Sequence, residues 1–276
     1  MTVPKEIPPR PIQRRTWASI GPDVLAFAIG LAIAWVGHWK TTDLVWSLWL
    51  GSLTLGYLTI LSTLAAGTVV GIKVVSHDEF PRRYRLPAIL GGTGLALVLL
   101  AFFSFHFCAF HAGHAGFLSV FFPLEGLSPE TFFDAFTNPF RLWKTAFRHL
   151  LPLYGAFLVP AIIAERSHVF AAIAGALKAV NERTPPDAAK QWFAADPERQ
   201  KAVRDPFVRP YLNVVRMHLL IFFFAFCHAV GLESFWVFSA VYFVYFFPWS
   251  AFRREGPTNP PQSPRESVRQ PNPIRP

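Results

Sequence analysis

Charged residues are scarce in this chain. They make up 16% of its 276 residues, whereas soluble domains carry about a quarter. Hydrophobic residues make up 52% and stand in long runs, which is typical of helices that lie in lipid. Each run must satisfy its own backbone hydrogen bonds there, as helices do and the shorter alternating strands of a barrel do not. The composition therefore predicts an all-α, polytopic transmembrane bundle.

Several functional signatures are also missing from the sequence. The only two cysteines, Cys108 and Cys227, lie inside apolar runs, which argues against an extracellular disulfide framework. No acidic residue stands clearly at the middle of an apolar run, which weakens a proton-coupled or cation-coupled transporter. Gly91–Gly94 lacks the lysine of a phosphate loop. No nucleophile–base–acid triad can be identified, so the sequence leaves open whether the protein is an enzyme.

Six apolar runs approach or exceed the roughly 20 residues that a spanning helix needs. A tight turn at Gly231–Ser234 separates the last two. The expected spans are Asp23–Trp39, Leu44–Ile72, the run after Pro87 through Phe121, Leu151–Ala164, Tyr211–Val230 and Phe235–Trp249.

The distribution of Lys and Arg sets the expected orientation. With six spans and the N-terminus inside, 21 of these residues fall in cytoplasmic segments and four in external segments, and Arg216 remains in a span. We therefore expect both ends of the chain in the cytoplasm, and a multi-pass protein of a bacterial cytoplasmic (inner) membrane. The net charge of +9 then comes mainly from cytoplasmic segments, where it attracts anionic lipid headgroups. It does not indicate nucleic-acid binding.

The same pattern divides the chain into three parts. Residues 1–21 form a basic, proline-rich tail that cannot build a core, and 253–276 form a second such tail, so both are expected to be disordered. Residues 22–252 hold the six spans, with a cytoplasmic loop at 181–210. In the outer segment 123–148, Ser128-Pro129 and Asn138-Pro139 each predict a helix cap followed by proline, and the short helices they begin are expected to lie on the membrane surface.

Small residues at four-residue steps indicate where the spans pack closely. These steps are Ala26/Gly30/Ala34, Gly67/Gly71 and Gly92/Ala96. They predict packing and imply no activity.

The most unusual segment places His106, Cys108, His111 and His114 within nine residues of one expected span. Buried histidines in a span need a reason. At about 100° per residue, His111 and His114 lie about 60° apart on one face, whereas His106 points elsewhere. By rise along the helix, His228 of the fifth span reaches the same level.

Imidazole is the usual ligand of zinc, copper and iron. The sequence therefore offers a candidate site for a transition metal (Zn, Cu or Fe) or haem, with an outer layer and an inner one. Its candidate ligands are His106, His111, His114, His168, His218 and His228.

Three alternatives remain open. A histidine in a span usually packs or bonds a group on the next helix, and the cysteines fit small buried thiols. Arg216, two residues before His218, could line the path of a small-solute transporter or channel. The chain could also be a non-catalytic accessory subunit of a membrane complex, with a membrane-protein partner or as a homo-oligomer.

Three short motifs stand out: His106-Phe107 with Phe110, His114 and Phe117; Ser167-His168 with Phe170; and Arg216-Met217-His218 before a run of large apolar residues. Together they resemble an uncharacterised family of bacterial integral membrane proteins known only as a domain of unknown function, DUF6498. The resemblance covers roughly residues 20–250. It singles out His106, His114, His168 and His218 and implies no substrate.

Overall fold

The computed structural model describes residues 17–78, 80–181, 219, 222–224, 226, 227, 230, 231 and 234–247. Within this part of the chain the secondary structure is helical and contains no strand. The helices are α1 (Trp17–Val36), α2 (Thr41–Ser76), α3 (Arg82–Phe121), α4 (Pro129–Phe133), α5 (Pro139–Thr145), the π-helical turn η1 (Ala146–Leu150), α6 (Leu151–Val169), α7 (Ala171–Asn181) and α11 (Phe235–Phe246).

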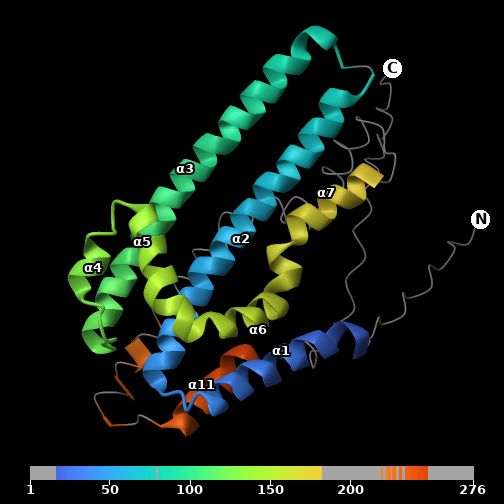
Figure 1. Ribbon diagram of the computed structural model, residues 1–276. Coiled ribbons are helices and arrows are strands. Elements are labelled where there is room, and N and C mark those ends of the chain that lie inside the picture. Colours follow the sequence, from blue (N-terminus) through green and yellow to red (C-terminus); the bar gives the residue numbers. More distant parts are fainter. Residues whose placement is uncertain are drawn as a thin grey trace, which may run out of the picture.

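The long helices α2 and α3 form an antiparallel pair that sets the length of the molecule (Figure 1). With 36 and 40 residues, they measure about 54 and 60 Å at 1.5 Å per residue. The hydrocarbon core of a bilayer is about 30 Å thick. Unless they tilt steeply, parts of both helices therefore lie outside it.

Three helical segments of the described chain have the length and apolar composition to cross a membrane: Thr41–Ser76, Arg82–Phe121 and the continuous run Pro139–Val169. The apolar stretches Ile20–Val36 and Phe235–Val244 are shorter. The protein is thus helical with membrane-spanning segments. Six spans and cytoplasmic ends stay predictions, and most of Tyr211–Val230, both tails and nearly all of the 181–210 loop lie outside the described residues.

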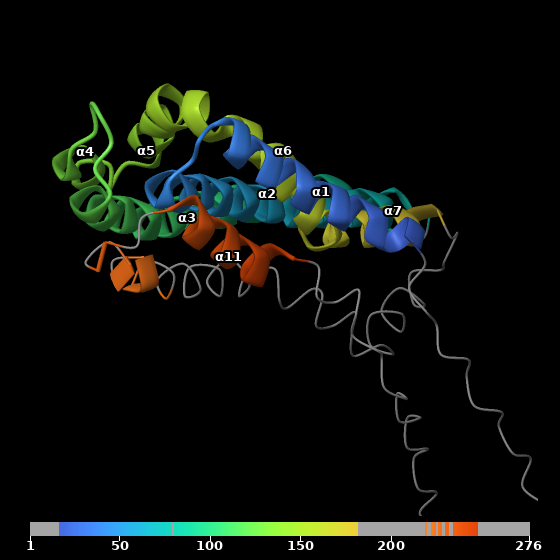
Figure 2. The same cartoon turned by 90° about the horizontal axis from the view of Figure 1, so that it is seen from below.

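Most of the other helices pack around one end of the α2–α3 pair, and α7 packs along α2 toward its other end. α6 lies against α1 and α2, and α7 continues along α2 toward Ser76 (Figure 1). α1 and α11 lie side by side, where Phe27 stacks on Tyr242 with ring centroids 5.2 Å apart. Figure 2 shows α5 and α11 on opposite sides of the α2–α3 pair.

Helix boundaries follow the capping residues found in the sequence. Ser128 is the N-cap of α4, and the Asn138 side chain accepts a hydrogen bond from the Arg141 backbone N–H at 3.2 Å at the start of α5. Both residues thus stand at the predicted N-cap positions, and the side chain of Asn138 makes the capping hydrogen bond whereas that of Ser128 does not. α3 begins at Arg82 and not after Pro87 as expected, because proline near a helix start removes only one backbone bond.

The buried core lies at the end of the molecule where α3 meets α4 and α5. Trp46 and Trp49 of α2 and Phe107 of α3 are buried there, together with Phe132 of α4 and Leu142 of α5. The buried positions of α3 run from Phe103 to Ser119, in the second half of the helix. In the remote half of the α2–α3 pair, α3 is largely exposed, whereas α7 packs on α2, where Ala66 and Val75 are buried.

Candidate functional site

The histidine-rich stretch of α3 lies in this core, facing α2. The aromatic side chains of α2 make the contact: the Trp49 indole N–H donates to the carbonyl oxygen of His111 at 3.0 Å, and the Trp46 N–H donates to that of Phe122 at 2.9 Å. The two indole rings thus connect α2 to α3 through their N–H groups, while the apolar faces of the rings are buried.

Both ring nitrogens of His111 are bonded within the protein. Nδ1 lies 3.0 Å from the Phe107 carbonyl oxygen, and Nε2 lies 3.3 Å from the hydroxyl oxygen of Ser52. A carbonyl can only accept, so Nδ1 carries the proton and donates it, and Nε2 of the neutral ring accepts from Ser52. With no exposed surface, this ring links α2 to α3. A metal ion at Nε2 would have to displace Ser52.

Aromatic rings enclose His111 on its remaining sides. Its ring centroid lies 4.2 Å from that of Phe107 and 5.8 Å from that of Trp49, and Phe107 stacks in turn on Phe103 at 4.8 Å. On the buried face of α3, Phe103, Phe107 and His111 therefore form a continuous row of contacting rings at four-residue steps.

His106 lies on a different face, as the helical geometry predicted. Its half-buried ring stacks on Phe102, with ring centroids 5.8 Å apart, and meets Phe110 edge-on at 5.0 Å. His114 is buried on the same helix as His111. His168 is exposed in the last turn of α6.

The four candidate ligands that the structure describes, His106, His111, His114 and His168, therefore do not gather at one point. In the described part of the chain, no group of three or more His, Cys, Asp and Glu side chains is arranged to hold a metal ion. His218 and His228 lie outside the described residues, so the two-layer arrangement stays a prediction.

Both cysteines are buried free thiols. Cys108 Sγ lies 3.1 Å from the hydroxyl of Tyr57 on α2. Tyr57 also packs edge-on against Trp143 of α5, with ring centroids 5.0 Å apart. Cys108 thus joins the α2–α3–α5 contact as a small packing group with one polar partner.

Sequence reasoning did not identify the α2 side of this region. Its contributors are Trp46, Trp49, Ser52 and Tyr57. At about 100° per residue they spread over roughly 140° of one side of the helix, so a signal was present. In an all-apolar run, however, periodicity does not separate the face that packs on protein from the face that meets lipid.

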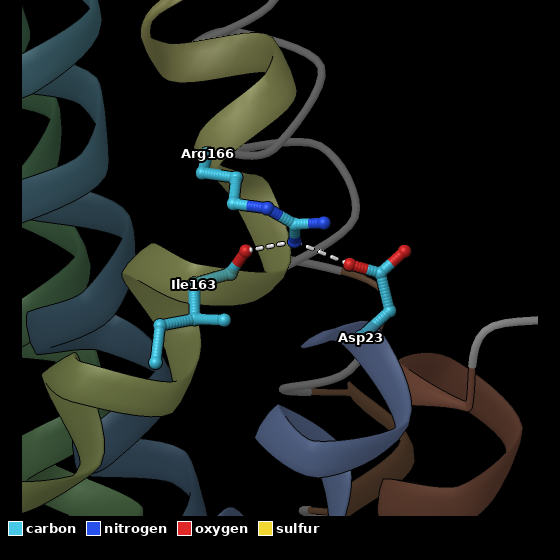
Figure 3. Close-up of polar contacts among 3 residues, drawn as sticks. All are labelled: Asp23, Ile163 and Arg166. Carbon is cyan, nitrogen blue, oxygen red and sulfur yellow. Dashed lines mark hydrogen bonds and ion pairs between the residues drawn. The ribbon is translucent and has the colours of Figure 1, made fainter. Parts of the chain in front are cut away.

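A second polar contact joins α1 to α6. The Arg166 guanidinium forms an ion pair with Asp23 and also donates to the Ile163 carbonyl oxygen (Figure 3). Asp23 therefore balances the charge of Arg166 at the end of α6. Lys73 is also engaged, donating to the Ala179 and Val180 carbonyl oxygens at the end of α7.

The geometry defines a helical membrane protein with an aromatic-lined, hydrogen-bonded histidine core and no identifiable reaction centre among the described residues. The chain belongs to the Family of unknown function (DUF6498), which matches residues 10–247. No functionally curated protein and no solved structure matches it.

Proposed function

We propose that the protein is a non-catalytic subunit of a membrane complex, and that the half of the α2–α3 pair remote from α4 and α5 binds another membrane protein. The observation that supports this proposal is a set of helical glycines with free space around them, which we call open glycines. A Cβ added at Gly67 or Gly71 of α2, or at Gly91, Gly92 or Gly94 of α3, would meet nothing within 4 Å.

Three of the glycines elsewhere in the helices lie against other side chains, whereas Gly51 in the packed half of α2 is also open. A Cβ at Gly30 would come within 2.0 Å of the Tyr242 hydroxyl oxygen, one at Gly56 within 2.2 Å of the Phe107 ring, and one at Gly116 within 2.9 Å of the Phe133 ring. These three glycines allow close approach within the chain.

Glycine inside a helix costs about 1 kcal/mol relative to alanine, so open glycines need another reason. In a membrane that reason is commonly a neighbouring helix. The surrounding surface could bind such a helix, because only 6% of the most apolar stretch of α3 is buried within the chain. The exposed apolar side chains on this half of α3 are Leu86, Ile89, Leu90, Leu95, Leu97, Val98 and Phe102.

The bonding of His111 also supports a non-catalytic role. Its two ring nitrogens are already used between α2 and α3. The polar groups of Trp49 and Tyr57 likewise bond α3. This hydrogen bonding holds helices together and leaves these groups engaged within the protein.

A transition-metal (Zn, Cu or Fe) or haem site is the second candidate function. It is favoured by the burial of His111 and His114 three residues apart on one helix, in surroundings that exclude water. Further ligands would come from His218 or His228. The transport alternative depends on Arg216, which lies outside the described residues.

Photo-crosslinking in the native membrane tests the subunit proposal. A photoreactive amino acid is placed at Leu90 or Leu97 of α3, and at Val159 of α6 as a control that is also apolar and exposed. We expect one protein adduct of constant mass from the two α3 positions and none from Val159. The adduct should weaken in Gly94→Leu, because Gly94 lies about 40° from Leu90 around the helix and a side chain there meets nothing within the described chain.

Three outcomes decide between the functions. Folded protein that gives no protein adduct at either α3 position would overturn the proposal. An adduct of twice the chain mass would mean that the surface binds a second copy of this chain and not a different protein. Near-stoichiometric metal or haem in purified protein, lost in a folded His106→Ala/His114→Ala variant, would favour the second candidate.

A further inference from the structure

The segment formed by α5 and η1 has two contrasting faces. Leu142, Ala146 and Leu150, at four-residue steps, are buried against the rest of the protein. The opposite side carries exposed cations at Arg141, Lys144 and Arg148, spaced by three and four residues and therefore on one helical face. We refer to these three side chains as the cation stripe.

Within the described part of the chain, the cation stripe has no anionic partner. Among the described residues, no carboxylate forms a salt bridge with any of its three members, although Arg166 at the end of α6 has Asp23. Like charges one turn apart repel and weaken a helix. A bound anion would remove that repulsion.

Exposed phenylalanines flank the stripe. Phe140 is 85% and Phe147 56% exposed, and they are seven residues apart, on an adjacent face of the same helix. An acidic soluble partner would leave these rings in water. A phospholipid offers phosphate for the cations and acyl chain for the rings.

The place of the stripe in the chain fits the same ligand. It stands at the start of the apolar run from 149 to 164, which contains no Asp, Glu, Lys or Arg and forms most of a membrane-spanning segment. Cations at the end of such a run lie at headgroup level. In the predicted topology, three of the four external Lys and Arg residues of the chain lie here, although such residues are usually depleted from external segments.

We propose that the α5–η1 face is a binding site for an anionic phospholipid. The headgroup phosphate lies between Arg141, Lys144 and Arg148, and the acyl chains lie against Phe140 and Phe147. Each guanidinium group can donate two parallel hydrogen bonds to two oxygens of a phosphate. The site is separate from the glycine-lined half of the α2–α3 pair and stands independently of the subunit proposal.

Photoreactive lipids test the site directly. Full-length protein in phosphatidylcholine nanodiscs is titrated with phosphatidylglycerol carrying a diazirine near the headgroup, and labelled peptides are identified by mass spectrometry. We expect labelling of the peptide that contains residues 139–150. Arg141→Gln/Lys144→Gln/Arg148→Gln should weaken that labelling roughly a hundredfold, because each cation near an anionic lipid surface contributes about fivefold.

Matched variants keep the result interpretable. Arg82→Gln/Arg83→Gln/Arg85→Gln removes three cations from the start of α3 and should leave labelling of residues 139–150 unchanged. Lys144→Arg keeps the charge and should retain labelling. Equal labelling by a phosphatidylcholine probe, or unchanged labelling of the folded glutamine variant, would overturn the proposal.

Discussion

The imidazole Nε2 of His111 on α3 lies 3.3 Å from the hydroxyl oxygen of Ser52 on α2. The two residues are 59 positions apart in the chain, and their contact closes a hydrogen-bonded path from one long helix to the other. A histidine used in this way is a packing residue, and its removal should change stability before it changes anything else.

His111→Ala should therefore lower the free energy of unfolding by about 2 kcal/mol, because it leaves a cavity and removes the partner of the Ser52 hydroxyl. His106→Ala, at a half-exposed ring, should cost less than about 0.5 kcal/mol. Thermal unfolding in detergent measures both. Loss of a bound metal from His111→Ala with no change in unfolding temperature would contradict the packing role.

Gly30→Ala should destabilise the protein by about 1–3 kcal/mol through overpacking, because its new Cβ would lie 2.0 Å from the Tyr242 hydroxyl oxygen. Removing that oxygen with Tyr242→Phe should recover part of the loss. Gly67→Ala is the matched control, since its Cβ meets nothing within 4 Å, and it should be neutral or slightly stabilising. Equal losses at Gly30 and Gly67 would mean that Tyr242 does not pack on α1.

The ion pair between Asp23 and Arg166 joins residues 143 positions apart and holds the start of α1 against the end of α6 (Figure 3). Their side chains are 25% and 36% exposed, so solvent screens the attraction. A double-mutant cycle with Asp23→Asn and Arg166→Gln should give a coupling of about 0.5 kcal/mol that shrinks with added salt. Strictly additive single losses would argue against the pair.

Lys73→Met should loosen the end of α7. The Lys73 ammonium lies 3.0 Å from the Ala179 carbonyl oxygen, one of the terminal carbonyls that have no partner within their own helix. Hydrogen exchange should speed up in the peptide covering residues 171–181 and stay unchanged in α6. Arg82→Met serves as the control. Faster exchange throughout the protein would indicate a general loss of stability instead.

Much of the helical framework could be predicted from the sequence. Ser128 and Asn138 cap helices whose proline follows at the next position, and the start of α11 at Phe235 follows the turn at Gly231. Such boundaries depend on neighbouring residues, so local chemistry determines them. The expected boundaries of the long helices were less accurate: α3 already begins at Arg82, because a proline near a helix start removes only one backbone bond.

The small-residue steps illustrate a limit of such prediction. All three predicted close packing, yet only Ala26/Gly30/Ala34 has ring neighbours within the described part of the chain, where Gly30 meets Tyr242 and Phe157. Four-residue spacing establishes that a helix can be approached closely. It carries no information about which helix approaches.

By itself, the sequence determined that this is an all-helical protein with membrane-spanning segments and that His106 and His111 face different ways, because composition and helical periodicity are local properties. Tertiary structure alone decided that His111 bonds Ser52, that Arg166 pairs with Asp23, and that the first half of α3 stays largely exposed. Those outcomes depend on which helices meet, and that is set by side-chain packing between segments far apart in the chain.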